Sequence, residues 1–260
     1  IVHANLEGPF ADERRPTTKS IAFRFDPILI PMLQKYNFSL FTAANNHSLD
    51  MGRAGFAESQ ENLKKAGIHF YGSEYEVNDD SYLLEQIGNM KIVFIGVNDT
   101  HTLVDVADVT LLIGRGKKEA DRVVLNIHWG AEYEPLSNAR QRAFAHALID
   151  AGAAVIIGHH PHVVEEIEVY KDKPIFYSLG NFIFDQYFSI PTQQGLGIGL
   201  VFHDDKTSIY VFPLQGVQSQ VTLMKGLNSA QFMQNLIDRS KVGEYTINNF
   251  NFTIPFSSYE

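Results

Sequence analysis

Three histidines lie within four positions of the stretch "GHHPHV", residues 158–163, directly after an apolar run. Imidazole binds divalent Zn, Mn, Fe and Co. The chain has no cysteine, so any metal must be held by imidazole, carboxylate, amide or water. Pro161 has a fixed φ, which limits how the flanking histidines can reorient. Both a metal-binding turn and an ordinary polar loop are compatible with this stretch alone.

Three further polar clusters also follow or end apolar, strand-like runs: "ANLEG", "AANNHSLD" and "NIHWGAEY". In an α/β sheet, ligands gather at the carboxyl ends of strands, so clusters that are distant in the chain can meet there. His3, Asn5 and Glu7 share one face of an extended segment. Imidazole, carboxylate and amide groups brought together suit a pair of divalent ions, of which one activates a water and the other steadies a leaving oxygen.

Each cluster also has a structural interpretation when it is taken alone. Glu7 is compatible with a solvated turn, and Asn45 and Asn46 with turn formation after a strand. His47 or His128 by itself is more typical of a hydrogen-bonded structural histidine. The joint placement of the clusters favours the functional interpretation.

The elements that must position these residues alternate between apolar runs and amphipathic stretches, which is typical of an α/β domain. A helix is expected from the N-cap Asp50 to a stop at Gly67. Glycine-rich turns predict hairpins, one of them at Gly88. The other expected elements are strands at residues 1–7, 38–44, 122–130 and 153–158, helices at 27–36 and 137–151, a late hairpin turning at 204–205, and a closing helix with an extended tail from about 226.

Composition narrows the class of protein further. The chain has 260 residues of which 45% are hydrophobic, enough for one large core with or without a small appendage. Its net charge of −9 argues against a nucleic-acid partner, because phosphate binding needs a basic face. No apolar run reaches the roughly 18 residues of a membrane span. Because the sequence begins with Ile1, we expect the native start, with a signal peptide, an anchor or a first structural element, to lie upstream.

Four motifs in register resemble the CapA/PgsA family, the capsule or poly-γ-glutamate biosynthesis proteins related to calcineurin-like metallophosphoesterases. They are "ANLEGP", "TAANNHSLDMGRAGF", "HWGAEYEP" and "IIGHHPHVVEEIEVYKDKPIFYSLGNFIFDQ". The resemblance implies an α/β fold with a two-sheet β-sandwich flanked by helices, in four layers (αββα). It implies a domain over residues 1–225, with one N-terminal element upstream, and a C-terminal extension over 226–260 that packs on the same domain or forms a tail.

The resemblance also implies a site with two divalent ions, Zn, Mn or Fe. His47 would face the leaving group as the catalytic residue. Glu7 would stand where the wider superfamily has a metal-bridging aspartate. The implied metal ligands are Glu7, Asn46, His128, His160 and His162. The residues expected to contact substrate are Asn5, Asn45, Glu132, Tyr133, His159 and Asn181.

Two classes of function follow as hypotheses. The first is a metal-dependent hydrolase that uses a metal-bound hydroxide on a phosphoester or related anionic polymer, or on an amide or γ-glutamyl bond. The second is a non-catalytic subunit that binds or exports the polymer within a capsule-synthesis complex, with a structural or vestigial metal site. Both predict an anionic polymer or phosphoester and other capsule-synthesis membrane proteins as partners. We expect a location in the cell envelope outside the cytoplasm, anchored through the upstream segment, with the cytoplasm as the alternative.

Overall fold

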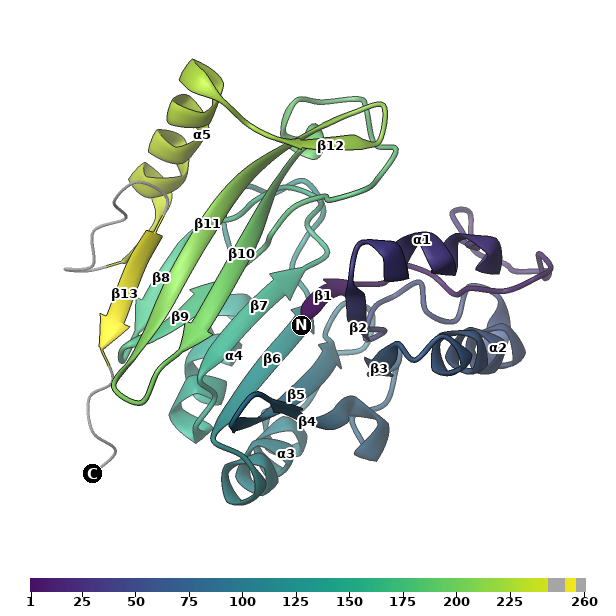
Figure 1. The fold of residues 1–260 in the computed structure, drawn as a ribbon, viewed down its shortest axis with the longest axis horizontal. Coiled ribbons are helices and arrows are strands. Elements are labelled where there is room, and N and C mark those ends of the chain that lie inside the picture. The colour runs from purple at the N-terminus through teal and green to yellow at the C-terminus, as the bar shows by residue number, and fades with distance from the viewer. Residues whose placement is uncertain (243–250, 256–260) are drawn as a thin grey trace. The chain divides into compact units, whose positions relative to one another are not determined.

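The computed structural model describes residues 1–242 and 251–255, and the chain divides into two compact units. Unit 1 comprises Ile1–His128 and Ala151–Ala153, and unit 2 comprises Trp129–Asp150 and Ala154–Glu260. Figure 1 shows their helices and strands. Each unit combines helices with β-sheet, which confirms the predicted α/β class.

Unit 1 contains two groups of hydrogen-bonded strands, with order β1-β2-β3 in one and β4-β5-β6 in the other. Its strands are β1 (Val2–Asn5), β2 (Phe38–Thr42), β3 (His69–Tyr71), β4 (Tyr82–Ile87), β5 (Met90–Asn98) and β6 (Arg122–His128). Its helices are the short η1 (Pro27–Leu29) and η2 (Asp79–Ser81), and α1 (Ile30–Lys35), α2 (Gly52–Lys65) and α3 (Val106–Glu119). The predicted strands and the hairpin at Gly88 are thereby confirmed.

The first sheet of unit 1 is parallel and carries helices α1 and α2 on one face (Figure 1). Ala4, Phe41 and Phe70 stand side by side in register, so their side chains point to the same face. Phe41 packs there with Ile30 of α1 and Leu63 of α2 in one hydrophobic cluster. Burial of these apolar side chains holds the two helices on the sheet.

The opposite face of this sheet packs on β5 and β6. The His3 ring stacks near Phe94 with centroids 6.1 Å apart, and the Tyr71 ring lies tilted to Phe94 with centroids 6.0 Å apart. Asn126 Nδ2 donates to the Tyr71 hydroxyl at 2.7 Å, and that hydroxyl lies 3.0 Å from His3 Nε2. Burial lowers the pKa of His3 to about 3, so its ring is neutral in this contact.

Helix α3 covers the far face of the second sheet and completes the four layers of unit 1. It begins after Asp105, whose side chain accepts the Ala107 N–H as an N-cap. The sequence pattern did not predict this helix, because Gly114 and Gly116 lower its intrinsic propensity. Packing explains one of them, since a Cβ on Gly116 would lie 2.9 Å from Val123 Cγ2. Within unit 1, the order helices, sheet, sheet, helix is the predicted αββα arrangement.

Unit 2 contains the strand group β7-β9-β8 and a second group in which β11 pairs with β10, β12 and β13. Its strands are β7 (Val155–His159), β8 (Ile167–Tyr170), β9 (Lys173–Phe176), β10 (Gln194–Phe202), β11 (Lys206–Val217), β12 (Gln220–Leu223) and β13 (Asn251–Pro255). Its helices are α4 (Ala139–Ala151), η3 (Pro191–Gln193) and α5 (Gly226–Arg239). Ala151, the last residue of α4, belongs to unit 1.

The C-terminal part of unit 2 contains both elements predicted from residue 226 onward. Helix α5 buries Phe232, Met233 and Leu236. Part of the predicted extended tail is strand β13, which pairs antiparallel with β11. The rest of that tail, residues 243–250 and 256–260, lies outside the described residues, and the boundary at residue 225 stays a prediction. Among the helices that the structure describes, none combines the length and apolarity needed to cross a bilayer.

Close backbone approach in unit 2 requires glycine at the start of the three-histidine stretch. A Cβ on Gly158 would lie 1.9 Å from the Tyr177 carbonyl oxygen and 2.6 Å from Trp129 Nε1. The same carbonyl accepts the Trp129 indole N–H at 2.8 Å. Trp129 is fully buried and stacks on Tyr177 with centroids 5.8 Å apart. Because Gly158 has no side chain, strand β7 can pass directly against Trp129 and Tyr177 just before the histidine turn.

We expect Gly158→Ala to lower the free energy of unfolding by about 3 kcal/mol or more, because an atom cannot be inserted against a backbone carbonyl without moving β7. Urea unfolding followed by circular dichroism measures the change. Gly114→Ala is the matched control, since no atom lies within 4 Å of its added Cβ and it sits in helix α3. The control should raise stability by about 0.5–1 kcal/mol. Equal stability of the Gly158 variant and the wild type would contradict this role.

Candidate functional site

Strand ends of unit 1 bring an acidic and an imidazole side chain together. Strand β1 ends at Asn5, two residues before Glu7, and β6 ends at His128. His128 Nε2 lies 3.3 Å from Glu7 Oε1, and the His128 side chain is 1% exposed. The sequence placed both residues at strand ends, and the structure brings these two together. A carboxylate and an imidazole nitrogen this close can act as an ion pair or as two ligands of one cation.

Asn5 holds the Glu7 carboxylate in place, and Asn45 holds Asn5. The Asn5 side-chain amide donates to Glu7 Oε2. The Asn45 amide donates to Asn5 Oδ1 at 3.0 Å and to the Leu6 carbonyl at 2.7 Å. Asn45 Oδ1 in turn accepts the backbone N–H of His47 at 3.0 Å. Asn5 and Asn45 were predicted to contact substrate, and here they connect the ends of β1 and β2.

Asn46 meets one physical requirement of a cation ligand. It is buried, and its Oδ1 accepts no hydrogen bond within residues 1–242 and 251–255. A buried carbonyl oxygen left without a donor loses free energy unless a ligand or water compensates it. Carboxamide oxygen, carboxylate and imidazole are all donors that Zn, Mn or Fe accepts. The donor chemistry of Glu7, Asn46 and His128 therefore fits a divalent cation.

His47 forms a hydrogen-bonded pair with Asp50. Its Nδ1 lies 2.7 Å from Asp50 Oδ2, and the Asp50 side chain is fully buried. A carboxylate only accepts hydrogen bonds, so Nδ1 carries the proton and Nε2 is left for other chemistry. The prediction that Asp50 is the N-cap of the following helix is wrong. Helix α2 begins after Met51, and the Asp50 carboxylate accepts from His47, Lys19 and the Phe23 N–H instead.

Lys19 connects this pair to a second buried carboxylate, and sequence reasoning missed it. Its Nζ lies 2.9 Å from Asp50 Oδ1 and 3.1 Å from Glu74 Oε1, and it also donates to the Asn46 carbonyl. Burial lowers the pKa of Lys19, but hydrogen bonds to the two carboxylates raise it above its usual value overall. Burial also raises the pKa of Asp50, whereas its hydrogen bonds to His47, Lys19 and Phe23 lower it overall. Both groups are therefore charged at neutral pH.

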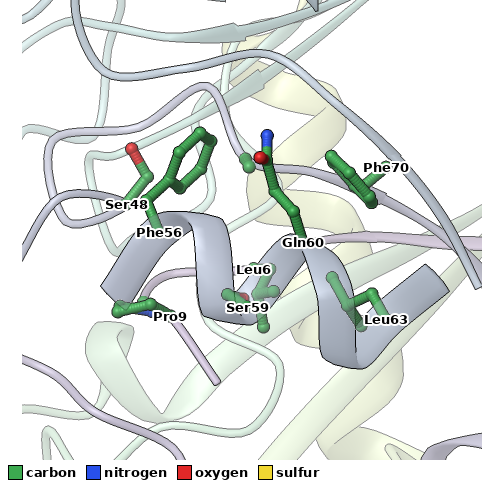
Figure 2. Close-up of a pocket in the computed structure, with 10 residues that line it drawn as sticks. Leu6, Pro9, Ser48, Phe56, Ser59, Gln60, Leu63 and Phe70 are labelled. Carbon is green, nitrogen blue, oxygen red and sulfur yellow. The ribbon is translucent and has the colours of Figure 1, made fainter. Parts of the chain in front are cut away.

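Helix α2 closes the back of this region. Figure 2 shows a cavity between the helix and the segments that flank Glu7 and His47. It holds about 10 Å³, the space of one water molecule. Its lining residues are Leu6, Gly8, Pro9, Ala43, Ser48, Phe56, Ser59, Gln60, Leu63 and Phe70. The packing here is tight, so this cavity is no substrate site, and α2 serves to hold the two segments.

The histidine turn of unit 2 has an unusual backbone. His160 and His162 both have positive φ, +100° and +59°, on either side of Pro161. Non-glycine residues rarely occupy this region, and such strain persists where the surroundings hold it and often lies at functional sites. The Tyr133 N–H donates to the Pro161 carbonyl at 2.8 Å and fastens the turn. The two imidazole centroids lie 6.2 Å apart.

Asn181 sets the orientation and tautomer of His162. Its Nδ2 donates to the Thr192 carbonyl at 2.9 Å, and a carbonyl only accepts, so Asn181 Oδ1 must be the atom 2.9 Å from His162 Nδ1. His162 Nδ1 therefore carries the proton, and its Nε2 has the lone pair that a metal ion needs. The prediction placed Asn181 at the substrate, whereas its observed contacts are those of a residue that positions His162.

The remaining predicted residues of unit 2 lie around the same turn. His159 ends β7, and its carbonyl accepts the Trp129 N–H at 3.1 Å. The Tyr133 ring stacks near His162 with centroids 6.1 Å apart. Glu132 is exposed beside it. Contact of His159, Glu132 or Tyr133 with a substrate stays a prediction.

Two buried glutamates follow the turn and were not singled out from the sequence. Glu166 accepts both the N–H and the hydroxyl of Ser137, before helix α4. Glu165 accepts from Gln141 Nε2 at 2.9 Å, and burial raises the pKa of Glu165 to about 8. Glu165 is therefore largely protonated at neutral pH. Both carboxyl groups attach the turn to α4.

The predicted metal ligands are divided between the units. Glu7, Asn46 and His128 belong to unit 1, and His160 and His162 belong to unit 2. Among the described residues, no three Cys, His, Asp or Glu side chains form a group arranged to hold a metal ion. The full set as one dinuclear centre stays a prediction.

The chain belongs to the family described as bacterial capsule synthesis protein PGA_cap, whose model matches residues 1–186. This confirms the resemblance inferred from the four motifs. The chain is 35% identical over 202 residues to the PGA biosynthesis protein CapA of Bacillus subtilis (strain 168), and the match covers 71% of this chain and 53% of that protein. It is also 35% identical over 207 residues to the capsule biosynthesis protein CapA of Bacillus anthracis, covering 71% of this chain and 50% of that protein. The chain thus spans about half the length of these curated relatives.

A solved structure with partial likeness is that of a novel phosphatase from Mycoplasma pneumoniae. The two are 12% identical with a TM-score of 0.40, over 78% of this chain and 89% of the other.

We expect Asn181→Ala to change the tautomer of His162, because the side chain that accepts the Nδ1 proton is removed. The ¹⁵N chemical shifts of the imidazole nitrogens, recorded on metal-free protein, should show Nδ1–H in the wild type and a mixture with Nε2–H in the variant. His146, which lies 3.1 Å from Glu168, provides an internal control whose shifts should not move. Unchanged His162 shifts in the variant would exclude the positioning role.

We expect Lys19→Met to lower the free energy of unfolding by about 1–3 kcal/mol at pH 7, because two buried carboxylates lose their shared cation. Urea unfolding measures it, with exposed Lys35→Met as the control that changes stability by less than about 0.5 kcal/mol.

Asp50 has a lowered folded-state pKa, so its contribution to the free energy of unfolding is present above pH about 4 and is lost as the pH falls through that lowered value. This acid-induced loss should be smaller in the variant, since Lys19 is one cause of the lowering.

Proposed function

We propose that this protein is a metal-dependent hydrolase that acts on a phosphoester during assembly of a polyglutamate capsule. The observation that carries the proposal is the His47–Asp50 pair, in which a buried carboxylate fixes the imidazole through Nδ1 at 2.7 Å. A general acid must present a defined nitrogen to its substrate, and this hydrogen bond defines which nitrogen of His47 that is. Lys19 Nζ lies 2.9 Å from Asp50 Oδ1, and the hydrogen bonds from His47, Lys19 and Phe23 lower the pKa of Asp50, so the partner of His47 is an ionised carboxylate.

In this proposal the cation ligands are Glu7, Asn46, His128, His160 and His162. Bound divalent ions would supply charge stabilisation and lower the pKa of a nearby water. Asn5 holds the Glu7 carboxylate, Asn45 holds Asn5, and Asn181 leaves His162 Nε2 unprotonated. With both ring nitrogens protonated, His47 donates the Nε2 proton to the leaving oxygen, which departs as a hydroxyl group, and the ring keeps its Nδ1 proton on Asp50.

The names of the curated relatives support a part in capsule synthesis. Both Bacillus proteins are called biosynthesis proteins of PGA or of the capsule. We therefore place this protein in the cell envelope, with capsule-synthesis membrane proteins as partners and a phosphoester or anionic polymer as substrate.

The same names favour a second candidate, a non-catalytic subunit that binds the polymer, because they describe synthesis rather than hydrolysis. Cells carrying His160→Ala distinguish the two. Normal capsule output, in a strain in which deletion of the protein abolishes that output, would support the non-catalytic subunit.

The hydrolase is tested by metal content and turnover on the same preparation. We expect Mn- or Zn-supplemented protein to bind metal by ICP-MS and to cleave bis-p-nitrophenyl phosphate. His47→Gln should lose roughly 10²- to 10⁴-fold in kcat with metal content unchanged, because it loses only the proton donor. His160→Ala should lose both metal and turnover. Exposed His101→Ala is the matched control and should keep both.

Metal-loaded protein that cleaves no phosphoester would overturn the phosphoesterase. Cleavage of poly-γ-glutamate instead, detected by product analysis, would assign the same residues to amide hydrolysis.

A further inference from the structure

Unit 2 presents an aromatic corner beside the histidine turn, formed by Tyr133, Phe184 and Phe188. Tyr133 meets Phe188 edge to face, with centroids 5.2 Å apart and planes at 86°. Phe184 lies 4.9 Å from His162, whose ring is also stacked near Tyr133. Tyr133 is 43% exposed and Phe188 is 66% exposed. Large aromatic surface is therefore left open to solvent immediately next to a predicted ligand histidine.

The corner is held rigidly. The Tyr133 backbone N–H donates to the Pro161 carbonyl at 2.8 Å, and the residue has a φ of +67°. Its hydroxyl accepts from Gln186 Nε2 at 3.1 Å, and Gln186 Oε1 accepts from Asn181 at 3.1 Å. Asn181 in turn hydrogen-bonds to His162, whose ring stacks near Tyr133. A ring fixed before binding costs little conformational entropy when a ligand stacks on it.

The same loop exposes further apolar surface at Phe182, Ile183, Tyr187 and Ile190, each at least 46% exposed. Clustered exposed apolar side chains mark a binding surface more often than a chance feature of the fold. An aromatic corner with amide groups at its edge is the composition of a small-molecule site.

The charged residues in the segments that carry the aromatic corner restrict the class of ligand. Residues 129–139 and 179–195 contain no lysine or arginine, and they hold Glu132, Glu134 and Asp185. A polyanion such as poly-γ-glutamate meets like charge here at short range. A cation cage needs space between its rings, and Tyr133 and Phe188 are already in contact. A neutral sugar ring fits, because its apolar C–H face can stack on the aromatic rings while its hydroxyls bond to amide and carboxylate groups.

We propose that the aromatic corner of Tyr133, Phe184 and Phe188 is a binding site for a neutral sugar ring. The site does not depend on the metal centre, so it is independent of the proposed hydrolase. It lies in unit 2 alone, and every contact that carries it is between residues of that unit.

Saturation-transfer NMR and isothermal titration calorimetry test the site on the full chain in EDTA, with fully N-acetylated chitotetraose and cellotetraose, both neutral, as probes at about 10 mM. We expect at least one probe to bind with a Kd on the order of 1 mM or below. Phe188→Ala removes one wall and should weaken that binding roughly fivefold or more. Tyr133→Phe keeps the ring and should retain most of the affinity.

Leu111→Ala is the matched control, because Leu111 is a similarly exposed apolar residue, in helix α3 of unit 1 and outside the loop that carries the corner. It should bind the probe within about twofold of the wild type. Circular dichroism checks that each variant is folded. Absence of binding by both probes, or equal binding by Phe188→Ala, overturns the proposal. Binding of choline or poly-γ-glutamate in place of sugar, lost in Phe188→Ala, overturns it too and assigns the corner to that ligand.

Discussion

Close packing of the two sheets in unit 1 determines the geometry of the candidate site. Gly96 lies at their interface, where a Cβ would come within 3.1 Å of Thr42 Oγ1 and of the Tyr71 ring. The absence of a side chain there lets one sheet lie directly against the other. As a result Glu7, after the end of β1, and His128, at the end of β6, come within 3.3 Å of each other. A larger residue at position 96 would separate the sheets and so would separate these two groups.

Hydrogen bonds then orient each imidazole. Asp50 receives the Nδ1 proton of His47, and Asn181 receives that of His162, so that in both rings Nε2 is the nitrogen left for chemistry. The two acceptors differ in charge. Asp50 is a carboxylate, whereas the side chain of Asn181 is a neutral amide. The two predicted site histidines are thus held through the same nitrogen by partners of different charge.

Several features could be predicted from the sequence. Strand ends followed by His, Asn and Glu were recognisable because apolar runs stop abruptly at polar clusters. The family resemblance predicted His160 and His162, rather than His159, as ligands. The partners were not recognisable. Lys19 lies in a polar segment with nothing to distinguish it, and Asp50 carries the same local signal as a helix N-cap. Helix α3 was missed because its glycines weaken the local helix signal. Gly116 is needed there because a side chain at this position would collide with Val123.

The sequence by itself determined the family, the α/β class and which chemical groups stand at the strand ends, because these depend on residue type and on periodicities within a few positions. Only the tertiary structure decided which of those groups meet and how each is protonated. Glu7 and His128, or Lys19 and Glu74, are distant in the chain, and the groups that surround each of these pairs come from several elements at once. The aromatic corner arises in the same way, since Tyr133 and Phe188 become neighbours only when the chain folds.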